Sequence, residues 1–152
     1  MILHTPQFSE ISYSKKDVLF FENSLIGFPS DKHFLIFEHR KGSHFKWLLS
    51  LDQPGLAFPI VDPFIYVEDY DPCITLEEAK ALELEEKTPR FVYTMVTVPR
   101  GKPDEITINL AGPLIINAFT KKAKQVVLDD ERYSIKHSIF SSFSQDNIKK
   151  AA

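Results

Sequence analysis

The sequence predicts a mostly β fold: a small single-domain antiparallel β-barrel or sandwich with one short acidic helix at about residues 75–86. Short apolar runs recur along the chain between turns rich in glycine and proline, which is typical of antiparallel barrels and sandwiches. There are 13 phenylalanines against one tryptophan and five tyrosines, and aromatic rings pack well on a pleated surface. Helical patterns between most of the runs, which a parallel α/β sheet requires, are missing.

The predicted strands are short apolar runs, several of which end at a proline or a glycine. In residues 106–110 the apolar residues alternate with Thr107 and Asn109, so that one set faces the core and the other faces solvent. The same alternation occurs in residues 133–139. The predicted strands are residues 16–21, 33–38, 45–51, 57–62, 91–98, 106–110, 113–119, 125–128 and 133–139.

The helix has a recognisable start. Thr75 is a favourable N-cap and Glu78 follows three residues later, which together form a capping box. Apolar residues then fall on one face at helical spacing: Leu76, Ala79 and Leu82. We expect the helix to end near residues 84–87, ahead of Pro89.

The length of 152 residues fits one domain with one core. We expect residues 1–140 to form the β domain. Residues 141–152 are mainly serine, glutamine, asparagine and lysine with few apolar residues, and we expect them to form a polar, mobile C-terminal tail.

Composition argues against several classes of protein. The net charge of −3 and the pI of about 5.9 lack the basic excess of most nucleic-acid binders. The single cysteine, Cys73, fits a reducing compartment. The first residues do not resemble a signal peptide, and no apolar run approaches the ~20 residues of a membrane helix. We expect a cytoplasmic protein that binds neither membranes nor nucleic acid directly.

Motifs that carry catalysis are missing from the sequence. No two histidines have the spacing of a zinc-binding helix pair and Cys73 has no cysteine partner. There is no nucleophile elbow, P-loop or dinucleotide-binding turn. His137 lies on the apolar side of its predicted strand and is interpreted as a core or rim residue. We therefore expect a protein that is not an enzyme and that holds no cofactor or metal.

The acidic residues are concentrated in one segment. Residues 66–87 contain eight acids and two lysines, a charge of 2 − 8 = −6. One interpretation is a solvated helix face. The other is a docking surface for a basic protein, because complementary charge speeds association and selects partners. The candidate residues are Glu77, Glu78, Glu83, Glu85 and Glu86.

The segment of residues 20–29 is unusually apolar for a loop. Its Leu25 and Phe28 either fold back into the core or remain exposed as a patch of the kind that marks a binding site.

An ordered set of strings resembles the flagellar assembly factor FliW family, and together the strings cover nearly the whole chain. They are Thr5-Pro6-Gln7-Phe8-Ser9-Glu10, Ser24-Leu25-Ile26-Gly27-Phe28, Trp47-Leu48-Leu49-Ser50-Leu51-Asp52, Ala57-Phe58-Pro59-Ile60-Val61-Asp62-Pro63 with Tyr70, Thr107-Ile108-Asn109-Leu110-Ala111-Gly112-Pro113-Leu114-Ile115-Ile116-Asn117, Lys124-Gln125-Val126-Val127-Leu128 and Tyr133-Ser134-Ile135-Lys136-His137. The chain departs from the family pattern at Ser9, Ser24 and Ala123, where glycine is usual, and at Leu49, where glutamine is usual.

The resemblance implies a non-enzymatic regulator with two protein partners. FliW-like proteins bind flagellin in the cytoplasm, and they bind the RNA-binding translational repressor CsrA and so relieve its repression of flagellin mRNA. On this interpretation the acidic residues 77, 78, 83, 85 and 86 contribute to binding the repressor, because a protein that binds RNA carries a basic surface. Leu25 and Phe28 are the candidates for an apolar surface that docks flagellin.

Two alternatives from other classes remain open. A small β-barrel that binds a small ligand, or catalyses with residues distant in sequence, predicts a closed pocket with convergent polar groups. An oligonucleotide-binding barrel predicts a basic groove lined with aromatic residues.

Overall fold

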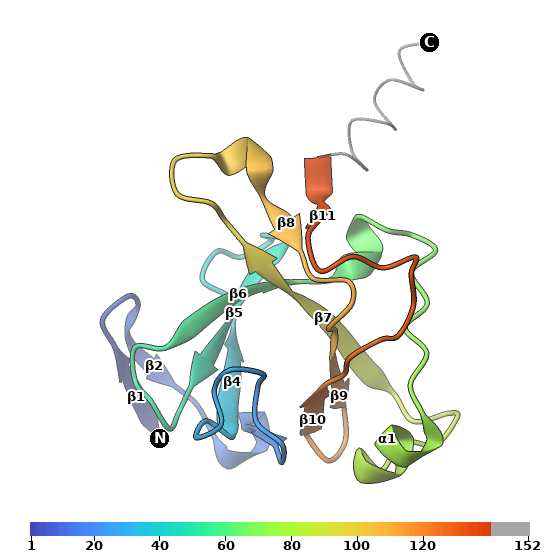
Figure 1. The fold of residues 1–152 in the computed structure, drawn as a ribbon. Helices are drawn as coiled ribbons and strands as arrows, with labels where there is room; N and C mark the ends of the chain where they lie inside the picture. The colour runs from blue at the N-terminus through green and yellow to red at the C-terminus, as the bar shows by residue number, and fades with distance from the viewer. Residues whose placement is uncertain (141–152) are drawn as a thin grey trace.

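Most of the predicted apolar runs form strands in the computed structural model, which describes residues 1–140 (Figure 1). The predicted tail, residues 141–152, lies outside the described residues. In chain order the elements are β1 (Ile2–Thr5), β2 (Ser9–Ser12), η1 (Lys15–Asp17), β3 (Leu19–Phe21), β4 (His33–Phe37), β5 (Phe45–Ser50), β6 (Ala57–Val61), η2 (Pro63–Ile65), α1 (Leu76–Ala81), β7 (Arg90–Thr97), η3 (Pro103–Glu105), β8 (Thr107–Ile108), β9 (Leu114–Asn117), β10 (Lys122–Gln125) and β11 (His137–Ser138).

A 7-strand barrel forms the centre of the protein, which confirms the predicted fold class. Its strands follow the order β7-β6-β5-β4-β3-β10-β9, and β9 pairs with β7 to close the ring. All of these pairs are antiparallel except β3–β10, which is parallel. A closed ring with an odd number of strands cannot alternate direction throughout, so one parallel pair is required. Short strands β8 and β11 extend the sheet beyond β7.

The barrel interior is filled by large apolar side chains from most of its strands. Phe21, Phe34, Leu48, Ile60 and Leu114 are fully buried in this cluster or nearly so. The rings of Phe21 and Phe34 meet edge to face, with centroids 5.2 Å apart. Burial of each such side chain contributes roughly 1.5–3 kcal/mol, so this cluster is a major source of the stability of the barrel.

Two outer layers cover opposite parts of the barrel. The hairpin of β1 and β2 packs Leu3 against Leu35 and Leu49. On the other side, shown in Figure 1 with α1, Leu82 of the α1 C-cap joins a cluster with Val126. Buried side chains from the middle and the C-terminal part of the chain complete this second cluster.

The structure corrects three of the predicted strands. Residues 16 and 17 are not extended, because the Asp17 carboxylate accepts a hydrogen bond from the Ser14 N–H (2.9 Å) and stabilises η1. The strand predicted at 125–128 lies earlier, as β10. Only His137–Ser138 of residues 133–139 forms a strand, and Ile135 is 66% exposed. The alternation there correctly predicts the inward side of Tyr133, His137 and Ile139 but not that of Ile135.

The hairpin of β1 and β2 was not predicted. Its strands have only four residues each, and β2 begins at Ser9 with φ 59°, a conformation that serine rarely adopts. Within residues 1–140, no helix combines the length and hydrophobicity required to cross a bilayer.

Candidate functional site

The acidic helix begins where the sequence predicts. The Thr75 hydroxyl accepts a hydrogen bond from the Glu78 N–H (3.1 Å), and the Glu78 carboxylate accepts one from the Thr75 N–H (3.0 Å). This reciprocal capping box satisfies two backbone donors at the helix start. Glu78 therefore has a structural role in addition to its charge.

The helix ends earlier than predicted: α1 stops at Ala81, whereas the sequence predicted about residue 86. The Leu84 N–H donates to the Ala79 carbonyl (2.8 Å) and the Glu83 N–H donates to the Lys80 carbonyl (3.1 Å). These two bonds form a Schellman motif, which requires a left-handed residue at the position of Glu83. Glu83 has φ 55°. Because glycine is absent here, the stop signal was hidden in the sequence.

The predicted apolar face of the helix is only partly correct. Leu82 is buried and Ala79 is half-buried, but Leu76 is 84% exposed. A helix of six residues has fewer than two full turns, so its first apolar side chain points away from the barrel.

Asn117, at the end of β9, fixes the turn that follows α1. Its side-chain amide donates to the carbonyls of Leu82 (2.9 Å) and Glu83 (3.1 Å). Its side-chain oxygen accepts hydrogen bonds from the N–H groups of Phe119 (2.9 Å) and Thr120 (3.1 Å). Asn117 is 1% exposed, and it joins the acidic turn to the β9–β10 turn. Sequence reasoning missed this residue.

The chain beyond Glu83 is also held in place. The Arg90 guanidinium donates to the Glu85 carbonyl (2.7 Å), and the Thr88 hydroxyl accepts a hydrogen bond from the Glu85 N–H (3.0 Å). The acidic turn, defined as residues 75–88, is thus tied to β7 and β9. A partner that binds these carboxylates meets a preorganised surface.

The five candidate carboxylates differ in their surroundings. Glu83 pairs with Lys122 (3.5 Å) and Glu78 pairs with Lys124 (3.8 Å), both from β10. The other three are exposed and make no ion pair within the described residues: Glu77, Glu85 and Glu86.

The apolar loop places its candidates differently from expectation. Leu25 is 3% exposed and belongs to the barrel core, so the expectation that it offers an exposed patch is wrong. Phe28 is half-buried, with its ring against Phe58 at 4.9 Å. The side chain that faces solvent is Ile26, which is 63% exposed. Gly27, at φ 89°, permits the turn that separates the buried residues from the exposed one.

Gln125 holds this loop against the barrel. Its side-chain oxygen accepts a hydrogen bond from the Ile26 N–H (3.1 Å), and its amide donates to the Gly112 carbonyl (3.3 Å). A Cβ on Gly112 would lie 2.8 Å from the Asn109 amide nitrogen and 3.2 Å from that of Gln125. The loop therefore depends on a glycine that lets the side-chain amides of Asn109 and Gln125 approach the backbone closely.

The acidic turn and the apolar loop meet at β10. One small hollow is lined by Phe20 and Asn23, by Ala81 and Leu82, and by residues of β10. The two surfaces predicted separately from the sequence are therefore neighbours. A bulky partner of one would also approach the other.

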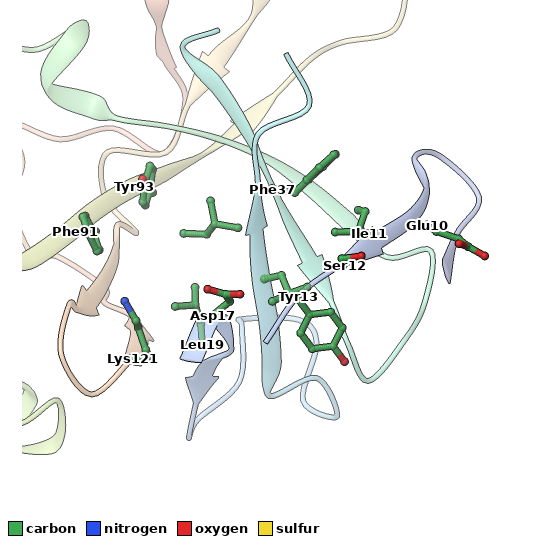
Figure 2. A pocket seen from close by; sticks show the side chains of 12 residues that line it. Glu10, Ile11, Ser12, Tyr13, Asp17, Leu19, Phe37, Phe91, Tyr93 and Lys121 are labelled. Atoms are coloured by element: carbon green, nitrogen blue, oxygen red, sulfur yellow. The ribbon is translucent and has the colours of Figure 1, made fainter. Parts of the chain in front are cut away.

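A second hollow was not predicted from the sequence. It is a groove of about 500 Å³ between the β2 strand, the end of β4 and the start of β7. Figure 2 shows Phe91, Tyr93 and Lys121 on one side of it and Ile11 with Ser12 on the other. We call it the β2 groove. Its residues are scattered along the sequence, so no local pattern marks it.

The β2 groove combines an apolar floor with charged groups at its margin. The Lys121 ammonium lies 5.9 Å from the centre of the Phe91 ring. The pKa of the Asp17 carboxyl is lowered by the hydrogen bonds from the Ser14 N–H and hydroxyl, with Lys121 among the weaker contributors. Burial raises the pKa of Tyr93, and the acidic groups nearby raise it further. The groove lacks the basic excess that an oligonucleotide-binding surface requires.

His137 and Cys73, the titratable residues considered for chemistry, have different surroundings. His137 is half-buried and desolvation lowers its pKa. Cys73 is exposed, with its sulfur 3.8 Å from an Asp71 carboxylate oxygen. In residues 1–140, no group of three or more histidine, cysteine, aspartate or glutamate side chains has the arrangement of a metal site.

Comparisons with known proteins place this chain. The family model described as "FliW protein" matches residues 2–139. The chain belongs to the FliW family. It is 31% identical to the flagellar assembly factor FliW of Magnetococcus marinus over 152 residues, which cover 100% of this chain and 93% of that protein. It is 37% identical to the FliW of Caldanaerobacter subterraneus, over 91% of this chain and 93% of the other.

A crystal structure of FliW has a similar fold, with a TM-score of 0.84 and 28% sequence identity. The match covers 92% of this chain and 97% of that one. Two departures from the FliW sequence pattern now have a physical meaning. Ser9 and Ser24, which stand where the family pattern has glycine, have φ values of 59° and 60°. Glycine adopts that conformation without steric cost. Ala123, the third departure, is a strand residue whose methyl group is buried in the barrel.

Proposed function

We propose that this FliW-family chain is a non-enzymatic, cytoplasmic regulator that binds flagellin and a CsrA-type RNA-binding repressor. Binding the repressor would relieve repression of flagellin mRNA, and flagellin would release the repressor by occupying the regulator. The relatives are named flagellar assembly factors. The observation that supports a protein-binding role most directly is the acidic turn, whose backbone is fixed while three of its carboxylates face solvent.

The repressor surface is assigned to the acidic turn. An RNA-binding protein carries positive charge on the face that contacts phosphates, so a fixed negative surface would attract it and speed the encounter. Glu78 and Glu83 already have lysine partners at 3.8 Å and 3.5 Å. We therefore expect the stronger contributions from Glu77, Glu85 and Glu86.

The test is a triple variant in which Glu77, Glu85 and Glu86 become lysine. The association rate with purified repressor at low salt should fall about tenfold or more, and the dependence of binding on salt should weaken. The matched control makes the same change of charge at exposed acids elsewhere, which are Asp104, Asp129 and Glu131. Equal effects of the two triple variants would refute the assignment. Glu78 is left intact because its loss would unfold the helix start.

The flagellin surface is assigned to the loop around Ile26. The exposed isoleucine lies on a turn that Gln125 and the buried Leu25 hold in place, so it presents an apolar side chain at little entropic cost. Ile26→Asp should weaken flagellin binding by about tenfold, since a charge replaces buried apolar contact. Ile135→Asp, at a side chain of similar exposure, is the control. Equal flagellin affinity of the Ile26 variant and the wild type in calorimetry would refute this location.

A further inference from the structure

The β2 strand has an edge that pairs with nothing in residues 1–140. β1 and β2 form a two-stranded sheet in which Ile2 faces Ser12 and His4 faces Glu10. The Met1 amino group donates to the Tyr13 carbonyl and the Tyr13 N–H donates to the Met1 carbonyl, both at 2.9 Å. Bonded and non-bonded pairs alternate along an antiparallel ladder.

It follows that the backbone groups of Glu10 and Ser12 point away from β1. Both residues line the β2 groove, whereas no residue of β1 does. Two N–H and two C=O groups, spaced as in an ordinary strand, therefore face the groove without a hydrogen-bond partner in the described part of the chain. Such an edge is a template for one more strand.

The opposite wall of the groove is open for a related reason. Phe34 of β4 pairs with Leu19, the first residue of β3. The residues before Leu19 fold into η1 instead of continuing the strand, so β3 does not extend far enough to pair with Ile36. On its other side Ile36 faces Leu48 in a non-bonded pair, because the neighbouring His33 carbonyl accepts the Leu51 N–H (2.8 Å). The Ile36 N–H and C=O thus also face the groove, without a partner in residues 1–140.

The side chains of the groove favour a peptide with a particular pattern. Leu35, Phe37 and Tyr93 provide apolar contacts across it, which suit apolar side chains at alternate positions of an extended peptide. Lys121 lies at one end of the groove and makes no ion pair within the described residues, and Asp17 stands between Lys121 and the β2 residues (Figure 2). This order of charges, with Lys121 at the end of the groove and Asp17 nearer β2, would orient a peptide that carries an acid and a base.

We propose that the β2 groove binds an extended segment of a partner protein, which adds as a third strand to the free edge of β2. The segment carries apolar residues at alternate positions, an acidic group that meets Lys121 and a basic group that meets Asp17. This site is separate from the acidic turn and from the Ile26 loop.

The probe for this site is a fluorescein-labelled synthetic peptide with alternating valine and threonine, lysine at one end and glutamate at the other. Its binding to the full chain is followed by fluorescence anisotropy. A version of the probe with N-methyl groups on alternate backbone amides cannot pair with a strand edge, and we expect it to bind about tenfold more weakly.

Two proline variants distinguish the two edges of the hairpin. Ser12→Pro removes an N–H that faces the groove, whereas His4→Pro removes one that faces away from it. Neither N–H takes part in the β1–β2 ladder, so both variants should keep the hairpin. We expect Ser12→Pro to weaken probe binding about fivefold to tenfold and His4→Pro to leave it unchanged. Lys121→Glu should weaken binding of the probe. A probe whose glutamate is replaced by lysine should bind the Lys121→Glu variant about as tightly as the original probe binds the wild type.

Failure of the probe to bind, equal binding of the N-methylated probe, or equal effects of the two proline variants would overturn the proposal. Sedimentation of the wild type and of Ser12→Pro tests whether a second copy of the chain occupies the groove instead. A wild-type dimer that Ser12→Pro abolishes would show that β2 pairs with a second copy, and this result would also overturn the proposal. The outcome is independent of the proposed function, because flagellin and repressor binding are measured with variants of the other two surfaces.

Discussion

Replacing Asn117 with alanine removes the side chain that joins the acidic turn to the β9–β10 turn. Four hydrogen bonds are lost, two from the amide to the carbonyls of Leu82 and Glu83 and two from backbone N–H groups to the side-chain oxygen. The Leu82 carbonyl is in the buried part of the network, so water cannot readily replace its partner.

The expected cost follows from the burial of these groups. A buried acceptor that loses its partner costs about 1–3 kcal/mol, and each partly exposed hydrogen bond contributes about 0.5–1 kcal/mol. We expect Asn117→Ala to lower the free energy of unfolding by about 3 kcal/mol, which is a fall in Tm of about 10 °C for a domain of this size. The Lys122–Glu83 pair should weaken with it, because Asn117 positions Glu83.

Urea unfolding, followed by circular dichroism and by the fluorescence of Trp47, measures the loss of stability. Hydrogen exchange at the Leu84 amide, which bonds to Ala79 at 2.8 Å, reports opening of the helix end. Asn23→Ala, at an exposed asparagine, is the control and should change the free energy of unfolding by less than about 0.5 kcal/mol.

Asn117→Asp separates the two halves of the network. The introduced carboxylate still accepts from Phe119 and Thr120 but repels the Leu82 and Glu83 carbonyls. We expect a variant that is unstable at neutral pH and recovers on mild acidification, when the carboxyl group takes up a proton and donates it in a hydrogen bond. An alanine variant as stable as the control, or an aspartate variant without recovery, would refute the reasoning.

Four further outcomes are expected. Ser9→Gly should raise the free energy of unfolding by about 1 kcal/mol in urea titrations, because it relieves a left-handed serine. Ser24→Gly should gain less, since it also loses the hydrogen bond from the serine hydroxyl to a loop carbonyl (3.0 Å). Gly112→Ala should cost about 1–3 kcal/mol in thermal unfolding, because the added methyl group would meet the Asn109 amide at 2.8 Å. The pKa of Asp52 is lowered from 3.8, since hydrogen bonds from two backbone N–H groups and a histidine outweigh the effect of burial. Its contribution to stability is therefore present above about pH 4 and is lost as the pH falls through the lowered pKa. When the free energy of unfolding is measured at decreasing pH, that of Asp52→Asn should therefore fall less steeply than that of the wild type.

The sequence predicts those features that depend on local pattern. The apolar runs of β4, β5, β6 and β7 lie within a residue or two of their predicted bounds, because alternating and continuous apolar residues have few other stable arrangements. The capping box of Thr75 and Glu78 is confirmed for the same reason, since all its atoms come from four consecutive residues.

Features that depend on distant contacts were not predictable. The helix ends early where the amide of Asn117, at the end of β9, donates a hydrogen bond to the Leu82 carbonyl. The β2 groove joins residues from separate segments of the chain. A signal for Asn117 does exist: it is a polar residue at the end of the apolar run of β9, where a buried side chain must find hydrogen-bond partners. Leu25 misled because an apolar loop sequence does not reveal which of its side chains turns inward.

The single parallel pair of the barrel links assembly to the completeness of the chain. Phe20 lies beside Lys122 in that pair, so the ring closes only when a segment from near each end of the described chain is available, and such long-range closure is slow. β10 also supplies the side chains that steady the acidic turn and the Ile26 loop. A nascent chain that has not yet emerged as far as residue 125 therefore has neither surface in its final shape. A partner of either surface would bind only chains whose synthesis has passed β10.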